Sequence, residues 1–230
     1  MAVLLEGGCR VSTIREGTPH VDGSLTIWNQ IDKTTGAQAI ALRILECGRG
    51  LSPALRNEDL DEVLYALDDC RVLIDEVEYE IEADTGVYLR AGESLRVENH
   101  GLKLTCFVSA QSPSDGSEIE KRIVKLADQR ALPTADRWYR VLIDSDVTQF
   151  VGSIPPGRAP DHFHEYEEVL FILRGKGRMW TTDKGTEIGP GSCIYLPKRQ
   201  VHCVENTGEG DLRLLGVFYP AGSPAVRYEA

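Results

Sequence analysis

Short apolar runs recur along the whole chain and are separated by Gly, Pro, Asn and Asp. They include residues 39–45, 104–108, 169–173, 193–196 and 212–218. Apolar runs of about four to eight residues between turn-forming residues are typical of buried strands. The pattern therefore predicts an all-β chain whose short strands form sandwiches or barrels.

One segment has a helical pattern instead. The sequence Ser-Glu-Ile-Glu at 117–120 has the form of a capping box, and apolar residues follow at helical spacing. These are Ile119, Ile123, Val124 and Leu126. Turn-forming residues precede the segment and Leu132-Pro133 follows it. We therefore expect a helical connector over 111–135, between an N-terminal domain at 1–110 and a C-terminal domain at 136–230.

The two predicted domains resemble each other in sequence. Residues 56–65 align with 162–171, where Glu-Val-Leu is identical, and residues 87–89 align with 194–196. The offset is 106 residues between positions 56 and 162, and 107 between positions 87 and 194. A register that holds this closely over separate blocks indicates an internal duplication.

The duplication decides a local conflict. Leu60, Val63, Leu64 and Leu67 lie at i, i+3, i+4 and i+7, which alone would predict an amphipathic helix. The corresponding residues of the second copy lead into the apolar run 169–173, which suits a buried strand better. We therefore predict strands at both places.

Four residues of the second copy have the chemistry of a metal site. His162 and His164 point to the same face of a strand, since side chains alternate along it. A bend over residues 165–167 would return the chain and direct Glu168 to the same point, and His202 would come from a distant strand. Three imidazoles and one carboxylate suit a first-row divalent metal such as Fe, Mn, Zn or Ni. Four protein ligands leave coordination positions open for a substrate.

These residues resemble the signatures of the cupins. The spacing from His162 through His164 and Glu168 to Gly175 is similar to the first cupin signature, and Pro197-x4-His202-x3-Asn is similar to the second. Arg199 departs from the pattern, because cupins usually have Gly there. With the duplication, the resemblance implies a bicupin: two double-stranded β-helix barrels of jelly-roll type, joined by the connector.

The first copy lacks the ligands. Arg56 and Glu58 stand in place of the two histidines of the first signature, and Leu95 stands in place of His202. Only Glu62 corresponds to Glu168. We therefore expect an N-terminal barrel without a metal site. A less favoured alternative is a charged cluster of Arg56, Glu58 and Glu62 inside that barrel.

Alternation along the strands predicts which side chains share the metal cavity. Leu170 and Ile172 should follow Glu168 inward, and Gln200 and Val204 should flank His202. The sequence leaves open whether four further residues line the cavity: Phe150, Arg178, Trp180 and Tyr195. Inward-facing Arg178 would bind a substrate carboxylate, Trp180 would form an aromatic wall, and Tyr195 is a weak candidate for a general acid.

Composition narrows the partners and the location. The 25 Lys and Arg against 36 Asp and Glu give a net charge of −11, which disfavours nucleic acids and anionic membranes. The N-terminal apolar stretch is too short for a signal peptide, and the six cysteines form no Cys-x-x-Cys pair. We expect a cytoplasmic protein with reduced cysteines and a small-molecule substrate, and a homodimer stays open.

The metal site is more specific than the reaction it implies. The leading hypothesis is a metal-dependent enzyme acting on a small oxygen-rich substrate, a carboxylate, an enol or a phenol, with dioxygenase-like chemistry as the first choice. The alternatives are a metal-dependent isomerase, decarboxylase or lyase, or a non-catalytic protein that binds a small molecule through the metal.

Overall fold

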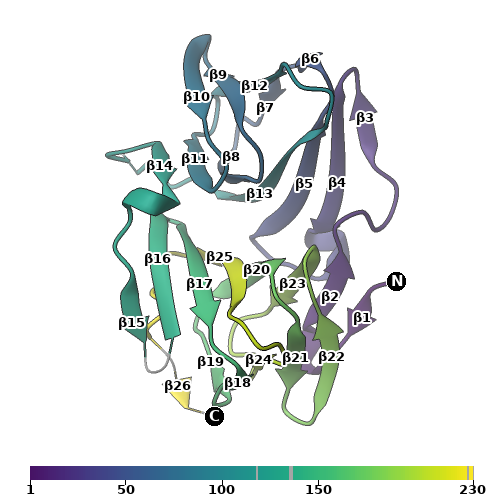
Figure 1. Cartoon of the computed structure of the whole chain (residues 1–230), viewed down its shortest axis with the longest axis vertical. Helices are drawn as coiled ribbons and strands as arrows, with labels where there is room; N and C mark the ends of the chain where they lie inside the picture. Colours follow the sequence, from purple (N-terminus) through teal and green to yellow (C-terminus); the bar gives the residue numbers. More distant parts are fainter. Residues whose placement is uncertain (118, 135–136, 227, 230) are drawn as a thin grey trace.

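Two sheets form the N-terminal barrel, which is the upper lobe in Figure 1. The computed structural model describes residues 1–117, 119–134, 137–226 and 228–229. The larger sheet contains β3 (His20–Asp22), β4 (Leu25–Ile31), β5 (Ala41–Cys47), β8 (Leu60–Ala66), β11 (Thr85–Leu89), β13 (Thr105–Pro113) and β14 (Ile123–Lys125). The smaller sheet contains β6 (Gly50–Leu51), β7 (Leu55–Arg56), β9 (Cys70–Ile74), β10 (Val77–Ile81) and β12 (Ser94–Asn99).

The C-terminal barrel is the lower lobe and repeats this plan. Its large sheet contains β1 (Val3–Leu4), β2 (Arg10–Thr13), β15 (Leu132–Thr134), β16 (Arg137–Asp144), β17 (Thr148–Ile154), β20 (Glu167–Arg174), β23 (Ser192–Leu196) and β25 (Leu212–Tyr219). A four-stranded sheet contains β18 (Gly157–Arg158), β21 (Gly177–Thr181), β22 (Lys184–Ile188) and β24 (Cys203–Asn206). A two-stranded sheet pairs β19 (His162–Phe163) with β26 (Tyr228–Glu229).

Side-chain alternation on the large sheets produces three cores. On β20, Leu170 and Ile172 pack inside the C-terminal barrel, whereas Val169 and Phe171 pack in a core shared by both barrels. Strand β8 divides its residues in the same way, with Leu64 packing inside the N-terminal barrel. The two large sheets therefore bury their outer faces against each other, and each barrel keeps a core of its own.

The strand register confirms the predicted duplication. Glu62 on β8 lies opposite Leu89 on β11, and Glu168 on β20 lies opposite Leu196 on β23. The offsets between these pairs are the 106 and 107 residues that the sequence predicts. The predicted strands at 60–67 and 169–173 are thus correct, because pairing on both sides of β8 and β20 outweighs the helical spacing of the leucines.

Two equivalent asparagines close matching turns in the two barrels. Nδ2 of Asn99 donates to the carbonyl of Cys47 at 2.9 Å, and Nδ2 of Asn206 donates to the carbonyl of Ile154 at 2.8 Å. Each amide also donates to the carbonyl four residues further along, at 2.7 and 2.8 Å. The second cupin-like signature therefore has a structural counterpart in the barrel that lacks the histidines.

The predicted helical connector is wrong. The described residues form no α-helix, only the 3-10 turns η1 (Glu6–Gly8), η2 (Lys33–Thr35) and η3 (Leu126–Asp128). Ile123 to Lys125 instead pair as β14 with β11, and Val124 is buried in the shared core. An open sheet edge offers this segment backbone hydrogen bonds and burial together. Glu118, within the proposed capping box, lies outside the described residues. No described helix is long and apolar enough to span a bilayer.

Strand pairing also crosses the expected domain limits. Residues 10–13 form β2, which pairs with β23 of the C-terminal barrel, although we assigned 1–110 to the N-terminal domain. Conversely, β14 from the 111–135 connector completes the N-terminal large sheet. The domain limits at 110 and 135 stay a prediction. Strands β2 and β14 each join a sheet on the other side of the limit that was assigned to them.

A buried carboxylate fastens the two barrels together. Glu167 is 1% exposed and accepts hydrogen bonds from the backbone of Gln38 at 2.8 Å and Ala39 at 2.7 Å, and from the hydroxyl of Tyr195. These donors come from the N-terminal barrel and from β23. Because a buried carboxylate without donors is costly, this contact fixes β20, the strand that also carries Glu168.

We predict that Glu167→Ala lowers the free energy of unfolding by roughly 2–4 kcal/mol, because it leaves several buried donors without an acceptor. The neighbouring Glu165→Ala is the control, since Glu165 forms only an exposed ion pair with Arg199 at 2.8 Å. That change should cost less than about 1 kcal/mol. Chemical denaturation measures both, and equal losses would contradict the structural role of Glu167.

Candidate metal centre

The first two histidines reach the site through a short strand and a bend. His162 on β19 pairs with His202, and each backbone N–H donates to the other's carbonyl, at 3.0 and 2.9 Å. His164 follows, the chain bends at residues 165–166, and β20 then begins at Glu167. Glu168 therefore turns into the barrel beside the histidines, by the bend that the sequence predicts.

Three of the four predicted ligands form a group that could hold one ion, and Glu168 lies beside two of them. Ligand nitrogens of His162, His164 and His202 lie within 4.8 Å of one another. Oε2 of Glu168 lies 3.8 Å from Nε2 of His164 and 3.6 Å from Nε2 of His202. Two donors bound to one ion at ~2.0–2.2 Å are themselves about 3–4 Å apart. The two distances from Glu168 fall in this range, and binding of one ion by all four residues stays a prediction.

Backbone carbonyls set the tautomer of two rings. Nδ1 of His202 lies 2.7 Å from the carbonyl oxygen of Gln200, and Nδ1 of His162 lies 3.1 Å from that of Pro160. A carbonyl only accepts hydrogen bonds, so Nδ1 carries the proton in each ring. Nε2 is then left with a lone pair for a metal, which is the usual arrangement behind metal-binding histidines.

Burial determines the electrostatics of the site. Oε2 of Glu168 is buried and accepts no hydrogen bond from the described residues. Burial raises the pKa of the Glu168 carboxyl to about 8. Burial, and then the neighbouring His162, lower the pKa of His202 well below its ordinary value. A neutral imidazole beside a carboxylate that lacks a cation is the donor set that a divalent ion would stabilise.

The departure at Arg199 leaves the turn intact. Arg199 has a φ of 62°, in the left-handed region that glycine adopts without strain. Its backbone N–H donates to the carbonyl of His164 at 2.7 Å, and its side chain pairs with Glu165 at 2.8 Å. The arginine therefore adopts the backbone conformation of the usual glycine, at a cost of about 1 kcal/mol. These contacts hold the turn against the His164 segment.

The N-terminal barrel places an arginine against the equivalent carboxylate. Glu62 is 3% exposed, and Nη2 of Arg43 on β5 lies 2.5 Å from its Oε1. Ser109 and Gln111 also donate to Glu62. A cationic side chain thus neutralises the buried charge in this barrel. Among the described residues, the only His, Cys or carboxylate group compact enough to hold a metal is that of the C-terminal histidines.

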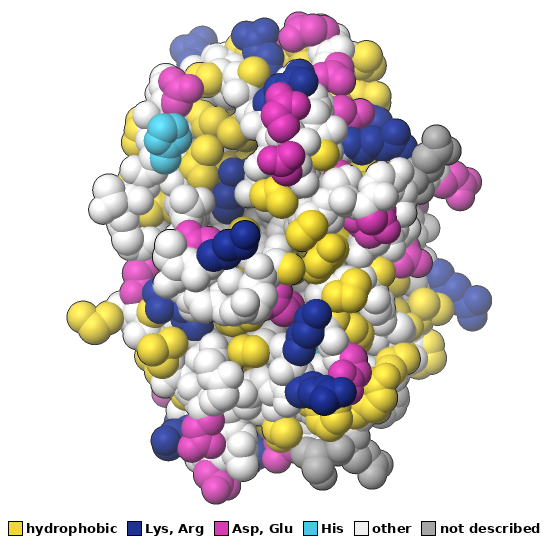
Figure 2. Space-filling view, turned by 180° about the vertical axis from the view of Figure 1, so that it is seen from behind, with side chains coloured by type: hydrophobic (Ala, Val, Ile, Leu, Met, Phe, Trp, Pro, Cys, Tyr) yellow, Lys and Arg dark blue, Asp and Glu magenta, His cyan; other side chains and the backbone are white. Residues whose placement is uncertain are grey.

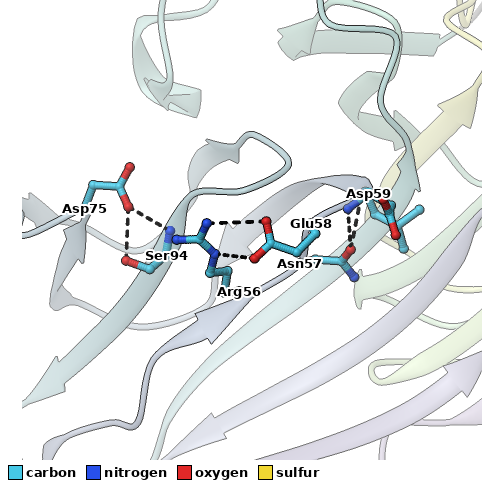
Figure 3. Close-up of polar contacts among 7 residues, drawn as sticks. Arg56, Asn57, Glu58, Asp59, Asp75 and Ser94 are labelled. Atoms are coloured by element: carbon cyan, nitrogen blue, oxygen red, sulfur yellow. Dashed lines mark hydrogen bonds and ion pairs between the residues drawn. The ribbon is translucent and has the colours of Figure 1, made fainter.

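The alternative cluster of Arg56, Glu58 and Glu62 is wrong. Arg56 and Glu58 form an exposed ion pair at 2.6 Å, with side chains 53% and 68% exposed. Figure 3 shows this pair, with the Asp75–Ser94 contact beside it. The positions that correspond to His162 and His164 have thus become surface positions, and Glu62 pairs with Arg43 instead.

A cavity of about 80 Å³ opens beside the four ligand candidates. Of the residues that the sequence left open, Phe150 lines it, as do the predicted Leu170 and Val204. Ile172 packs in the core below. Gln200 does not line the cavity as expected, because its amide donates to the carbonyl of Val201. Gln200 belongs to the turn before His202, where strand alternation does not apply.

Three other side chains point elsewhere. Met179 takes the inward position on β21, so Arg178 and Trp180 face outward, and Arg178 lies 4.9 Å from the Trp180 ring. Tyr195 lies in the core between the barrels and donates to Glu167. The roles of carboxylate binder, aromatic wall and general acid proposed for them are therefore wrong.

Several residues that line the cavity were not predicted from the sequence. Arg137, Tyr139 and Phe218 line the cavity, and Tyr166 stacks on His164 at 4.9 Å. On β16, Arg137 and Tyr139 face one side of the strand, and Trp138 and Arg140 face the other. Each side therefore has an arginine and an aromatic residue. Alternation alone thus indicates the two sets without showing which one faces inward.

Comparisons with known proteins agree with this geometry. Residues 150–218 match the cupin domain family. The C-terminal barrel is a cupin domain. Quercetin 2,3-dioxygenase of Bacillus subtilis is 33% identical over 78 residues, which cover 31% of this chain and 23% of that protein. The oxalate-binding protein of Thermotoga maritima is 36% identical over 67 residues, which cover 28% and 55%. The chain therefore spans only part of these curated relatives.

Solved structures extend the likeness to both barrels. The protein Ylba from E. coli superposes with a TM-score of 0.80 at 10% identity, covering 94% of this chain and 93% of that one. A mutant of Bacillus subtilis oxalate decarboxylase gives 0.76 at 12% identity, covering 93% and 78%. The chain thus has the two-barrel cupin fold, and identities this low show the fold alone.

We predict that Glu168→Gln stabilises the metal-free cupin as pH rises. The folded pKa of about 8 exceeds the ordinary 4.5, so wild-type stability from this group is complete below about pH 4.5 and is lost as pH rises to 8. The stability difference between variant and wild type should therefore grow from pH 5 to pH 8, as measured by urea titration. With Zn²⁺ present, the wild type should be more stable than the variant, because only the wild type has the carboxylate ligand. A difference independent of pH would contradict the raised pKa.

Proposed function

We propose that the C-terminal barrel is the active site of a metal-dependent enzyme acting on a small, oxygen-rich substrate. The observation that carries the proposal is the convergence of three imidazoles and a buried carboxylate at one cavity. A divalent ion at this place would act as a Lewis acid toward substrate oxygens. His162 and His202 would hold it through Nε2, since their Nδ1 atoms face carbonyls.

The cavity limits the size of the substrate. A volume of about 80 Å³ is well below the roughly 300 Å³ at which pockets for drug-sized ligands begin. Phe150, Leu170 and Phe218 give its wall an apolar surface beside the ligand candidates. This supports a substrate of few heavy atoms, a small carboxylate, enol or phenol.

Dioxygenase-type chemistry is the first candidate reaction. Isomerases and lyases need a positioned base. Among the described residues that line the cavity, Glu168 is the only carboxylate, and no lysine is present. Tyr139 also lines the cavity, and the lack of a second carboxylate or a lysine among these described residues favours oxidative chemistry. The similarity to a protein named quercetin 2,3-dioxygenase supports the same choice.

A metal-anchored binding protein is the second candidate. The same lack of a second carboxylate or a lysine among the described lining residues favours it, and a relative of the C-terminal barrel is named an oxalate-binding protein. This candidate differs from the first in one measurable respect: it would bind its ligand without converting it.

The distribution of charge on the surface indicates which class of partner the protein binds. Figure 2 shows acidic and basic side chains interspersed over one face, without a broad basic field on that face. With the net charge of −11, this supports a small-molecule partner rather than a nucleic acid or an anionic membrane. A homodimer and a cytoplasmic location stay predictions.

The test compares wild type with His164→Ala and with the control His20→Ala, which removes an exposed histidine on β3. Wild type and control should bind about one Fe, Mn, Zn or Ni ion per chain by elemental analysis, and His164→Ala should lose at least about tenfold in affinity. Oxygen uptake with small carboxylates, enols and phenols should follow the metal content.

Each hypothesis fails on a different result. A folded wild-type protein that takes up no metal from supplemented medium would exclude both candidates. Full turnover in His164→Ala would place the chemistry elsewhere. Metal-dependent ligand binding without turnover or oxygen uptake would replace the enzyme with the binding protein.

A further inference from the structure

One buried tyrosine differs from the others in how its hydroxyl is bonded. A buried tyrosine usually donates its hydroxyl proton, because a buried donor without an acceptor is costly. Five tyrosines are buried, and four of them donate to a carboxylate or a carbonyl of the protein: Tyr65, Tyr88, Tyr166 and Tyr195. Tyr139 is the fifth, and its hydroxyl has no hydrogen-bond partner among the described residues. An acceptor from outside the chain would complete the pattern.

Tyr139 belongs to the cavity of the proposed metal centre. It lies on the inner face of β16, in the same core as Phe150 and Leu170, and it lines the cavity beside the ligand candidates. Its neighbour across the strand pair is Gly152 on β17, which lines the cavity too and has no side chain to cover the ring. The hydroxyl is not one of the buried polar atoms that are sealed from solvent without a partner. It is therefore open to a ligand in the cavity.

The other hydrogen-bond donors of the cavity wall are already bonded or face away. Thr134 and Arg137 each have an interaction partner. The hydroxyl of Ser153 donates to a carboxylate on the loop before β25 at 2.7 Å, and Trp138 is 52% exposed on the outer face of β16. Apart from the ligand candidates, Tyr139 is thus the one described lining residue whose inward donor is uncommitted.

We propose that the hydroxyl of Tyr139 donates a hydrogen bond to the substrate and orients it at the metal centre. The substrate then carries two oxygens, one that faces the histidines and Glu168 and one that accepts from Tyr139. Because a metal ion attracts the charged oxygen of a ligand, the neutral phenol is left for a neutral carbonyl or hydroxyl oxygen. This inference rests on the proposed function and narrows it, because a substrate with a single oxygen lacks the second contact.

The experiment compares pyruvate with isobutyrate, in which a methyl group replaces the keto oxygen. Calorimetry measures both ligands on Zn²⁺-loaded protein, or on metal-free protein if no Zn²⁺ is taken up. The wild type should bind pyruvate about fivefold to tenfold more tightly, as expected for one hydrogen bond between neutral groups. Tyr139→Phe should lose this preference, because it removes only the hydroxyl. Tyr79→Phe, on β10 of the N-terminal barrel, is the matched control and should keep it.

Thermal unfolding without pyruvate separates a binding role from a structural one. Tyr139→Phe should keep the melting temperature of the wild type, because no hydrogen bond within the described protein is lost. Tyr166→Phe should lower the melting temperature, because the hydroxyl of Tyr166 donates to the carbonyl of Ser223 at 3.0 Å.

The proposal is overturned if the wild type binds pyruvate no more tightly than isobutyrate or binds neither. It is also overturned if Tyr139→Phe keeps the preference, or if this variant loses as much thermal stability as Tyr166→Phe. Metal uptake is measured separately by elemental analysis. Its failure would exclude the proposed function, and the comparison on metal-free protein would then decide the role of Tyr139.

Discussion

A carboxylate inside a barrel needs a positive partner, and this requirement determines how the two halves of the chain differ. Glu62 and Glu168 occupy equivalent positions on β8 and β20 and are both buried. In the N-terminal barrel the partner is Arg43, supplied by the chain itself. In the C-terminal barrel the described ion-pair partners of Glu168 are His164 and His202. Burial lowers the pKa of His202 well below its ordinary value and so keeps that ring neutral. A metal ion would supply the missing charge there.

The same duplication explains why the fold tolerates this difference. Both barrels fasten their central strand through a carboxylate one residue earlier: Glu167 accepts from Tyr195, and Asp61 accepts from Tyr88 at 2.7 Å. These contacts lie on the outer faces, where the large sheets meet. The inner faces could therefore diverge, one toward an internal ion pair and the other toward a cavity, without disturbing the joint between the barrels.

Much of this arrangement could be predicted from the sequence, because side-chain alternation along a strand and the constant offset between the two repeats can both be read from it. The spacing of His162, His164 and Glu168 predicted their shared face, and the 106-residue offset predicted the strand at β8 against its helical spacing. Prediction failed where the outcome depends on distant partners. The 117–126 segment has helical spacing, yet β11 offers it an open edge; β2 likewise joins a sheet almost two hundred residues away. Arg137 was missed because alternation on β16 fits either face.

We propose that one metal ion neutralises Glu168 and that none is needed beside Glu62. The most direct measurement is a crystal structure of the protein grown with the bound metal, with the ion located by anomalous scattering. We expect one ion at ~2.0–2.2 Å from His162, His164, Glu168 and His202, and none in the N-terminal barrel. An ion bound elsewhere, or a Glu168 carboxylate neutralised by a side chain of the protein, would contradict it.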